Sequence, residues 1–154
     1  MSTRDWFEGI RYKVKALARM ESDVEDARQR TGPRGQQFDS PGGRGAATDA
    51  SAPILSLADM EADLDRLRAE TNDEIERALD VLYGTSGRGG LAQARTSTDA
   101  DCICGYYLMG MSWREVADEM VKPESRSAKD WCRMRACRAF AYMDRVGMDW
   151  LMDS

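Results

Sequence analysis

The chain of 154 residues contains no histidine. Histidine is the most common general acid and base, the most common zinc and iron ligand, and the partner of the nucleophile in many hydrolases. Its absence disfavours hydrolytic and metal-dependent enzymes, and no residue is assigned a catalytic role. We therefore expect a protein that is not an enzyme and that carries no cofactor.

Cysteines are few, and their spacing does not suit a metal site. No two of them form a Cys-x-x-Cys pair, and on a helix cysteines two or five residues apart point in well-separated directions. We expect reduced, half-buried thiols and no bound metal. The four cysteines are Cys102, Cys104, Cys132 and Cys137.

Long apolar runs are absent, and large aliphatic residues are scarce. Leu, Ile, Val and Phe supply 23 of the 154 residues, so a core must also draw on the ten Met and four Trp. No stretch approaches the roughly 18 apolar residues of a membrane helix, and the N-terminus lacks a signal-peptide run. We expect a cytoplasmic protein with no membrane partner. No stretch alternates β-branched residues with period two, so the expected fold class is all-α.

The charge is strongly segregated along an acidic chain with a net charge of −5. Residues 56–82 hold nine acids against three arginines, whereas residues 122–146 hold seven bases against three acids. A locally basic segment on an acidic support is typical of a nucleic-acid-binding module.

Two apolar stripes with helical spacing predict an N-terminal helical hairpin over residues 1–83. The first helix runs from about residue 4 to 30, a Gly/Pro-rich flexible loop covers 32–55, and a coiled-coil-like helix follows Ser56. The hairpin can stand alone or pair with a second copy in a homo-oligomer. The stripes are Trp6, Ile10, Val14, Leu17 and Val24, and then Leu57, Met60, Leu64, Leu67, Thr71, Ala78 and Leu82.

A glycine-rich stretch beginning at Gly84 predicts a hinge over residues 84–97, and a helix-turn-helix segment follows over 98–154. Thr98 is the expected cap of a helix that runs through Met109, with Gly110 in a left-handed conformation after it. Ser112 and Glu115 have the spacing of a capping box that starts a second helix, which ends after Met120 or Val121. A third helix, which Ser125 or Ser127 caps, is expected to continue to about Asp144.

Helical projection of the third helix places Arg126, Lys129 and Arg133 on one narrow face. The alternative is that these cations form only a solvated surface. The expected apolar face lies opposite, against Val116, Ala117 and Met120, and consists of Ala128, Trp131, Cys132, Met134 and Tyr142.

The run ADCICGYYLMGMSWREVA, residues 100–117, resembles the signature of the ArpU- and RinA-type transcription regulators of phages and prophages. Their helix-turn-helix is similar to region four of sigma factors. The resemblance implies a protein that binds double-stranded DNA sequence-specifically and regulates phage or prophage transcription. Host RNA polymerase is then a further candidate partner.

In a helix-turn-helix the second helix enters the major groove and the first braces the DNA backbone. The expected groove contacts are Arg126, Lys129 and Arg133, with Ser127 and Arg114 as candidates for phosphate contacts. Two other classes stay open on the sequence. One is a phage small terminase subunit that acts in DNA packaging, and the other is a helical interaction protein that does not bind DNA.

Overall fold

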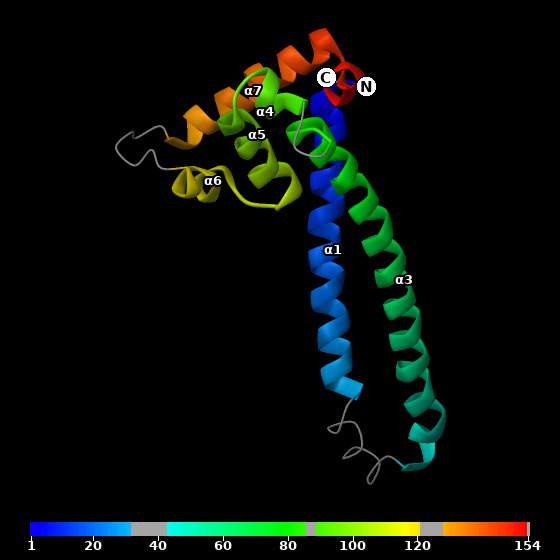
Figure 1. Cartoon of the computed structure of the whole chain (residues 1–154). Coiled ribbons are helices and arrows are strands. Elements are labelled where there is room, and N and C mark those ends of the chain that lie inside the picture. Colours follow the sequence, from blue (N-terminus) through cyan, green and yellow to red (C-terminus); the bar gives the residue numbers. More distant parts are fainter. Residues whose placement is uncertain (32–42, 86–88, 121–127, 154) are drawn as a thin grey trace. The chain divides into compact units, whose positions relative to one another are not determined.

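The computed structural model describes the backbone of residues 1–31, 43–85, 89–120 and 128–153, and the side chains of 1–30, 57–85, 89–120 and 129–151. This part of the chain is helical, without a strand element, which confirms the expected all-α class (Figure 1). No helix within it is long and apolar enough to cross a membrane.

Two long helices occupy the N-terminal half. Helix α1 spans Thr3–Thr31, close to the expected bounds, and helix α3 spans Gly43–Tyr83. The start of α3 corrects the expectation that the flexible loop extends to residue 55 and that Ser56 caps the second helix. Residues 46–52 contain four alanines, and alanine has the highest helix propensity, which favours the longer helix despite the flanking glycines.

The chain divides into two compact units, and this division differs from the one expected from the sequence. Unit 1 consists of residues 1–14 and 71–154, and unit 2 consists of residues 15–70. The first turns of α1 and the last turns of α3 thus pack with the C-terminal helices. A boundary drawn at residue 83 misses this because both helices run through the boundary between the two units.

Unit 2 is an antiparallel pair formed by the remaining parts of α1 and α3. Its register is defined by an ion pair from Arg28 to Glu61 at 3.2 Å and another from Arg68 to Glu21 at 3.3 Å. These pairs are about half exposed and add little stability, so burial of apolar side chains such as Val24 and Leu64 holds the pair together. Both side chains belong to the stripes expected from the sequence.

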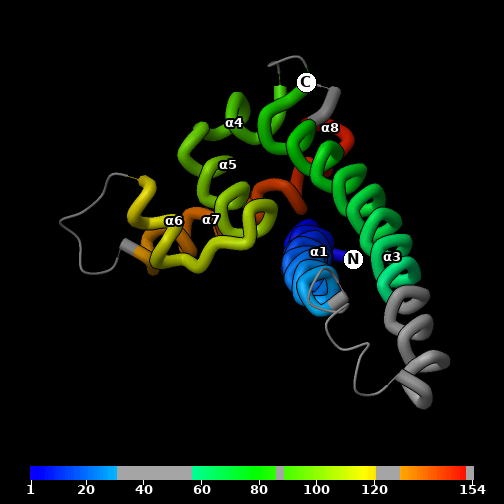
Figure 2. Tube along the Cα trace, turned by 90° about the horizontal axis from the view of Figure 1, so that it is seen from below, coloured from blue at the N-terminus to red at the C-terminus, as the bar shows by residue number. Residues whose placement is uncertain are grey.

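Unit 1 contains the remaining helices, which Figures 1 and 2 show grouped together. A π-helical segment, η1, directly follows α5, and α8 after α7 was not expected from the sequence. In order, these elements are α4 (Gly90–Ala94), α5 (Ser97–Ile103), η1 (Cys104–Leu108), α6 (Trp113–Glu119), α7 (Ala128–Val146) and α8 (Met148–Asp153).

The structure confirms some of the expected helix ends in unit 1 and corrects one. Ser112 and Glu115 form both hydrogen bonds of a capping box at the start of α6. Gly110 has a φ of 73°, as expected for the residue that follows the preceding helical segment. The cap of α5 is Thr96 and not Thr98, because the Thr96 side chain accepts a hydrogen bond from the Asp99 amide.

Part of the segment over 84–97, predicted as a hinge, is packed: residues 89–91 are buried, whereas Thr85 and residues 93–97 are exposed. Leu91 of α4 is completely buried within the main core of unit 1. Gly90 has a φ of 75°, and a Cβ atom added there would lie 2.4 Å from the backbone nitrogen of Gly84. The glycines therefore fold α4 tightly back onto the end of α3.

Candidate functional site

Helix α7 is anchored by a stripe of mostly small buried residues. The expected apolar face is confirmed in part, because Cys132 is buried and the half-buried Trp131 and Tyr142 pack against the core clusters. Met134 departs from it with 52% exposure, and the side chain of Ala128 lies outside the described residues. Small side chains let α7 approach its neighbours closely, so its buried face combines alanines and a cysteine with the larger Phe140 and Met143. The signal in the sequence is the three- and four-residue spacing of Cys132, Ala136, Ala139, Phe140 and Met143, all buried.

Helices α5, α6 and α7 meet in a second, smaller cluster that fits the expected packing of α7 on α6. Cys102, Val116, Ala117 and Cys132 are its buried members. Gly105 of η1 allows close approach, since a Cβ atom there would lie 3.1 Å from a methyl carbon of Val116. Residues 121–127, which connect α6 to α7, lie outside the described residues. The turn of the expected helix-turn-helix is therefore not described, and the motif stays a prediction.

A buried carboxylate links α4, α5 and α7. Asp99 is 1% exposed, and its two oxygens accept hydrogen bonds from Arg95 at 2.8 Å and Arg135 at 2.7 Å. Arg135 also donates to the Thr96 hydroxyl at 3.1 Å. The sequence does not predict this cluster, because nothing in the local pattern brings Arg135 to residues 36 or more positions away. The interaction engages Arg135 inside unit 1.

The predicted DNA contacts fall into two groups. Lys129, Arg133 and Arg114 are exposed, and none of them forms an ion pair with another described residue. Arg126 and Ser127 lie outside the described residues. Among the three described residues, Arg133 lines a pocket together with residues distant in sequence.

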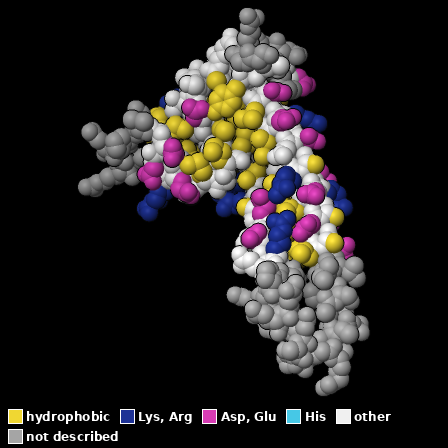
Figure 3. Space-filling view, turned by 60° about the horizontal axis from the view of Figure 1, so that its bottom comes forward, with side chains coloured by type: hydrophobic (Ala, Val, Ile, Leu, Met, Phe, Trp, Pro, Cys, Tyr) yellow, Lys and Arg dark blue, Asp and Glu magenta, His cyan; other side chains and the backbone are white. Residues whose placement is uncertain are grey.

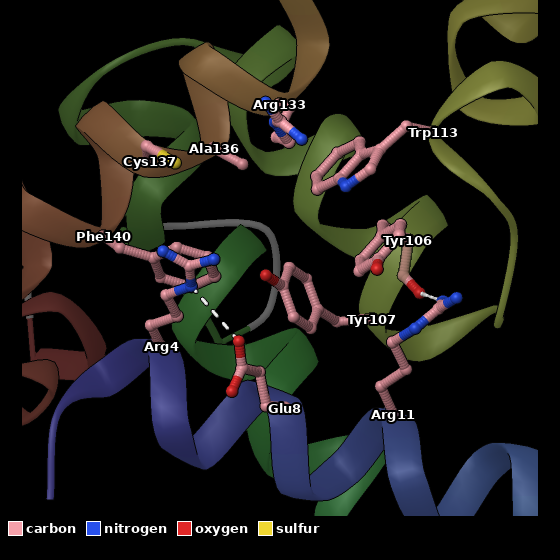
Figure 4. A pocket seen from close by; sticks show the side chains of 10 residues that line it. All are labelled: Arg4, Glu8, Arg11, Tyr106, Tyr107, Trp113, Arg133, Ala136, Cys137 and Phe140. Carbon is pink, nitrogen blue, oxygen red and sulfur yellow. Dashed lines mark hydrogen bonds and ion pairs between the residues drawn. The ribbon is translucent and has the colours of Figure 1, made fainter. Parts of the chain in front are cut away.

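That pocket has a volume of about 250 Å³ and lies between α1, η1, α6 and α7 (Figure 4). Its charged side chains are three arginines and one glutamate, and three aromatic side chains of η1 and α6 form much of its wall. We refer to it as the arginine pocket. It is lined by Arg4, Glu8, Arg11, Tyr106, Tyr107, Trp113, Arg133, Ala136, Cys137 and Phe140.

One wall of the arginine pocket is a stack of three planar groups. The Tyr106 and Trp113 rings are parallel, with centroids 4.0 Å apart, and the Arg11 guanidinium lies 3.6 Å from the centroid of the Tyr106 ring. Arg11 also donates to the carbonyl oxygens of Tyr106 and Met111, the latter at 2.9 Å. A π-helical turn interrupts the regular backbone hydrogen bonds of a helix, so carbonyl oxygens at its end need other donors. The hydrogen bonds from Arg11 supply such donors and stabilise the end of η1.

The other side of the arginine pocket is more open. Arg4 pairs with Glu8 at 3.2 Å through its Nε atom, and both side chains are about half exposed. The Tyr107 hydroxyl points toward the space between Arg4 and Trp113 (Figure 4). Burial, the largest cause, raises the pKa of Tyr107 to about 12, so the hydroxyl stays protonated at neutral pH.

The cysteines are free thiols, as expected, although their burial varies. Cys102 and Cys132 are completely buried beside each other, and desolvation raises the pKa of Cys102 to about 12, which makes a reactive thiolate at neutral pH unfavourable. Cys137 is exposed at the arginine pocket. Within the described residues no three cysteine or carboxylate side chains come together as metal ligands.

A second hollow in unit 1 has a different chemistry. It has a volume of about 390 Å³, and its charged members are the acids Asp101 and Glu119. Figure 3 shows hydrophobic side chains gathered on one face of unit 1, with acidic side chains among the charged groups beside them. This hollow suits no anion. It is lined by Tyr83, Asp101, Cys104, Gly105, Met109, Met111, Val116, Glu119 and Met120.

Comparison of the chain with protein-family models, with curated proteins and with solved structures finds no match.

Proposed function

We propose that the chain binds double-stranded DNA through α7 and regulates phage or prophage transcription. The observation that carries the proposal is the exposure of the α7 cations and their lack of ion pairs. Four of its five described cations are exposed and make no ion pair with another described residue, in a chain whose net charge is −5. These four are Lys129, Arg133, Arg138 and Arg145.

A comparison with unit 2 supports this interpretation. There, Arg28, Arg66 and Arg68 pair with acids on their own or the facing helix, whereas other exposed cations form no ion pair with a described residue. The balance of charge is what differs, because residues 15–30 and 57–70 hold six cations against nine acids, and α7 holds five cations against two acids. Exposed cations that outnumber the acids of their helix leave a positive potential, which attracts the phosphates of DNA and releases their counterions. The positive potential of the described surface is therefore expected to be highest along α7.

The packing of α7 also suits a helix that reads DNA. Its buried stripe and the Arg135–Asp99 pair hold it on α5, while α6 begins at a complete capping box and packs on the same cluster. A DNA-reading helix needs such rigid support, since its side chains must reach defined positions in the major groove. The resemblance of residues 100–117 to phage regulators adds the biological context to the proposal.

A salt titration of DNA affinity tests the proposal on the full-length chain. The double variant Lys129→Ala/Arg133→Ala is compared with Arg66→Ala/Arg68→Ala, which removes the same charge from α3. If both α7 cations neutralise phosphates, the slope of log affinity against log salt falls by about 1.8 in the first variant, about 0.9 for each contact. The control should keep the wild-type slope.

Two results would contradict DNA binding by α7. One is an equal change in both variants, which would indicate a general effect of net charge. The other is the absence of salt-dependent affinity for duplex DNA in the wild-type chain. If affinity for one duplex exceeds that for others, base contacts can be mapped, because loss of a base contact costs about 1–3 kcal/mol at one position of the site.

A further inference from the structure

We propose that the arginine pocket is a binding site for a phosphate group, with Arg4 of α1 and Arg133 of α7 as its two cationic ligands. The inference deepens the proposed function, because a DNA backbone phosphate is one source of this group. A free phosphorylated compound is the other source. The proposal assigns a binding role to Arg4, which is 129 positions away from Arg133 in the sequence and was not a candidate on the sequence alone.

The charge of the pocket favours an anion. Three arginines face one glutamate, and that glutamate binds Arg4 through Nε only. Arg4 forms no other ion pair with a described residue and also interacts with the Tyr107 hydroxyl, which directs its guanidinium into the pocket, and Arg133 makes no ion pair with a described residue. A guanidinium offers paired donors that match two phosphate oxygens, so two arginines at one pocket provide bidentate recognition from two sides.

The shape of the pocket separates the roles of its arginines. Arg11 is held by the Tyr106 ring and by two backbone carbonyls, so it acts as part of the wall and adds positive potential. Arg4 and Arg133 project from different helices toward the same space (Figure 4). The Tyr107 hydroxyl between these walls is a neutral donor that can bind a third phosphate oxygen.

The location of the pocket connects it with the DNA-binding helix. Arg133 lies one helical turn after Lys129, and Ala136, Cys137 and Phe140 continue the same wall along α7. A duplex that contacts Lys129 thus passes beside the pocket. Phosphate contacts on either side of a reading helix position it in the groove.

The first test titrates inorganic phosphate into the full-length chain and follows the indole N–H signal of Trp113, identified with Trp113→Phe, by NMR. Sodium chloride at the same ionic strength serves as the salt reference. We expect a saturable shift with phosphate in the wild type that is lost in Arg4→Gln/Arg133→Gln. The matched control is Arg138→Gln/Arg145→Gln, which removes two α7 cations outside the pocket and should keep the shift.

The second test measures the salt dependence of duplex DNA binding by Arg4→Gln. Arg4 is exposed on α1, so this substitution should leave folding intact, as circular dichroism can verify. A slope lower by about 0.9 identifies the occupant as a backbone phosphate. An unchanged slope together with the saturable phosphate shift identifies a free phosphorylated compound, and the pocket assignment still holds.

The pocket assignment is overturned if Trp113 responds to phosphate no more than to chloride and Arg4→Gln also leaves the DNA slope unchanged. It is likewise overturned if Arg4→Gln/Arg133→Gln retains the full phosphate shift. These results would not affect DNA binding by α7 itself, because Lys129→Ala, compared with Arg66→Ala, tests that proposal away from the pocket. Failure of the pocket and failure of the proposed function are thus distinguishable.

Discussion

At the scale of single residues, the most consequential interaction is that of Asp99. Its carboxylate is 1% exposed and binds Arg95 and Arg135, which lie on opposite sides of it in the sequence. A buried charge is tolerated only when it is paired and hydrogen-bonded, and here each oxygen has its own guanidinium. The same contact holds α7 in place, so its loss is expected to weaken the proposed DNA contact as well.

Asp99→Asn should lower the free energy of unfolding by about 2–4 kcal/mol. The amide keeps the shape but removes the negative charge, leaving two arginines without their counter-ion. The loss should not exceed this range, because the Arg95 and Arg135 side chains are 32% and 28% exposed and can be hydrated. Urea unfolding followed by circular dichroism measures the change. Asp118→Asn, at an exposed position of α6, should leave the urea concentration at the midpoint of unfolding unchanged. Equal midpoints for Asp99→Asn and the wild type would show that the pairs add no net stability.

At the scale of elements, α4 shows how glycines can mislead a reading of the sequence. The run from Gly84 to Gly90 looks like a hinge because glycine weakens helices. In the structure, the positive φ of Gly90 and the close approach of its backbone to Gly84 instead make a tight reversal. That reversal carries Leu91 into the core against residues of α1, α3 and α5.

Leu91→Ala should therefore destabilise the chain by about 2–5 kcal/mol, the range for a large apolar side chain removed from a packed core. Leu79→Ala is the matched control, because Leu79 lies on α3 and is 36% exposed, whereas Leu91 is completely buried. Thermal unfolding of both variants provides the comparison. A midpoint for Leu91→Ala as high as that of Leu79→Ala would mean that residues 89–97 are the hinge expected from the sequence.

At the scale of the whole molecule, the C-terminal segment is not an independent domain. Phe7 and Ile10 of α1 and Leu82 of α3 belong to the same buried cluster as Tyr107 and Phe140. Phe7 is completely buried, and its ring contacts those of Tyr107 and Phe140 with centroids 6.0 and 5.5 Å apart. Residues 98–154 without these partners would expose the apolar surface on which their helices pack.

Excision of residues 15–70, with a short glycine-serine linker between Val14 and Thr71, should leave unit 1 folded. The ends can be joined because Lys13 and Glu74, next to the excision, pair at 2.9 Å. We expect a helical protein with a cooperative thermal transition, while a fragment of residues 98–154 lacks such a transition. Circular dichroism of both polypeptides measures this difference. A fragment 98–154 as stable as the excised chain would show that the N-terminal turns are dispensable for the core.

What the sequence by itself determined is local. Helical periodicity defined α1 and the buried stripe of α3, and the Ser112–Glu115 spacing defined the start of α6, because caps and amphipathic faces depend on residues within one or two turns. The absence of histidine follows from composition, and the segregation of charge follows from the order of residues.

Only the tertiary structure decided which faces and which distant residues come together. Close packing of small side chains chose the buried face of α7, and the folding back of α4 made a core element of an expected hinge. The arginine pocket unites Arg4 with Arg133, and Asp99 unites Arg95 with Arg135. No periodicity encodes these pairings, because they depend on how helices far apart in the chain approach one another to bury their apolar surface.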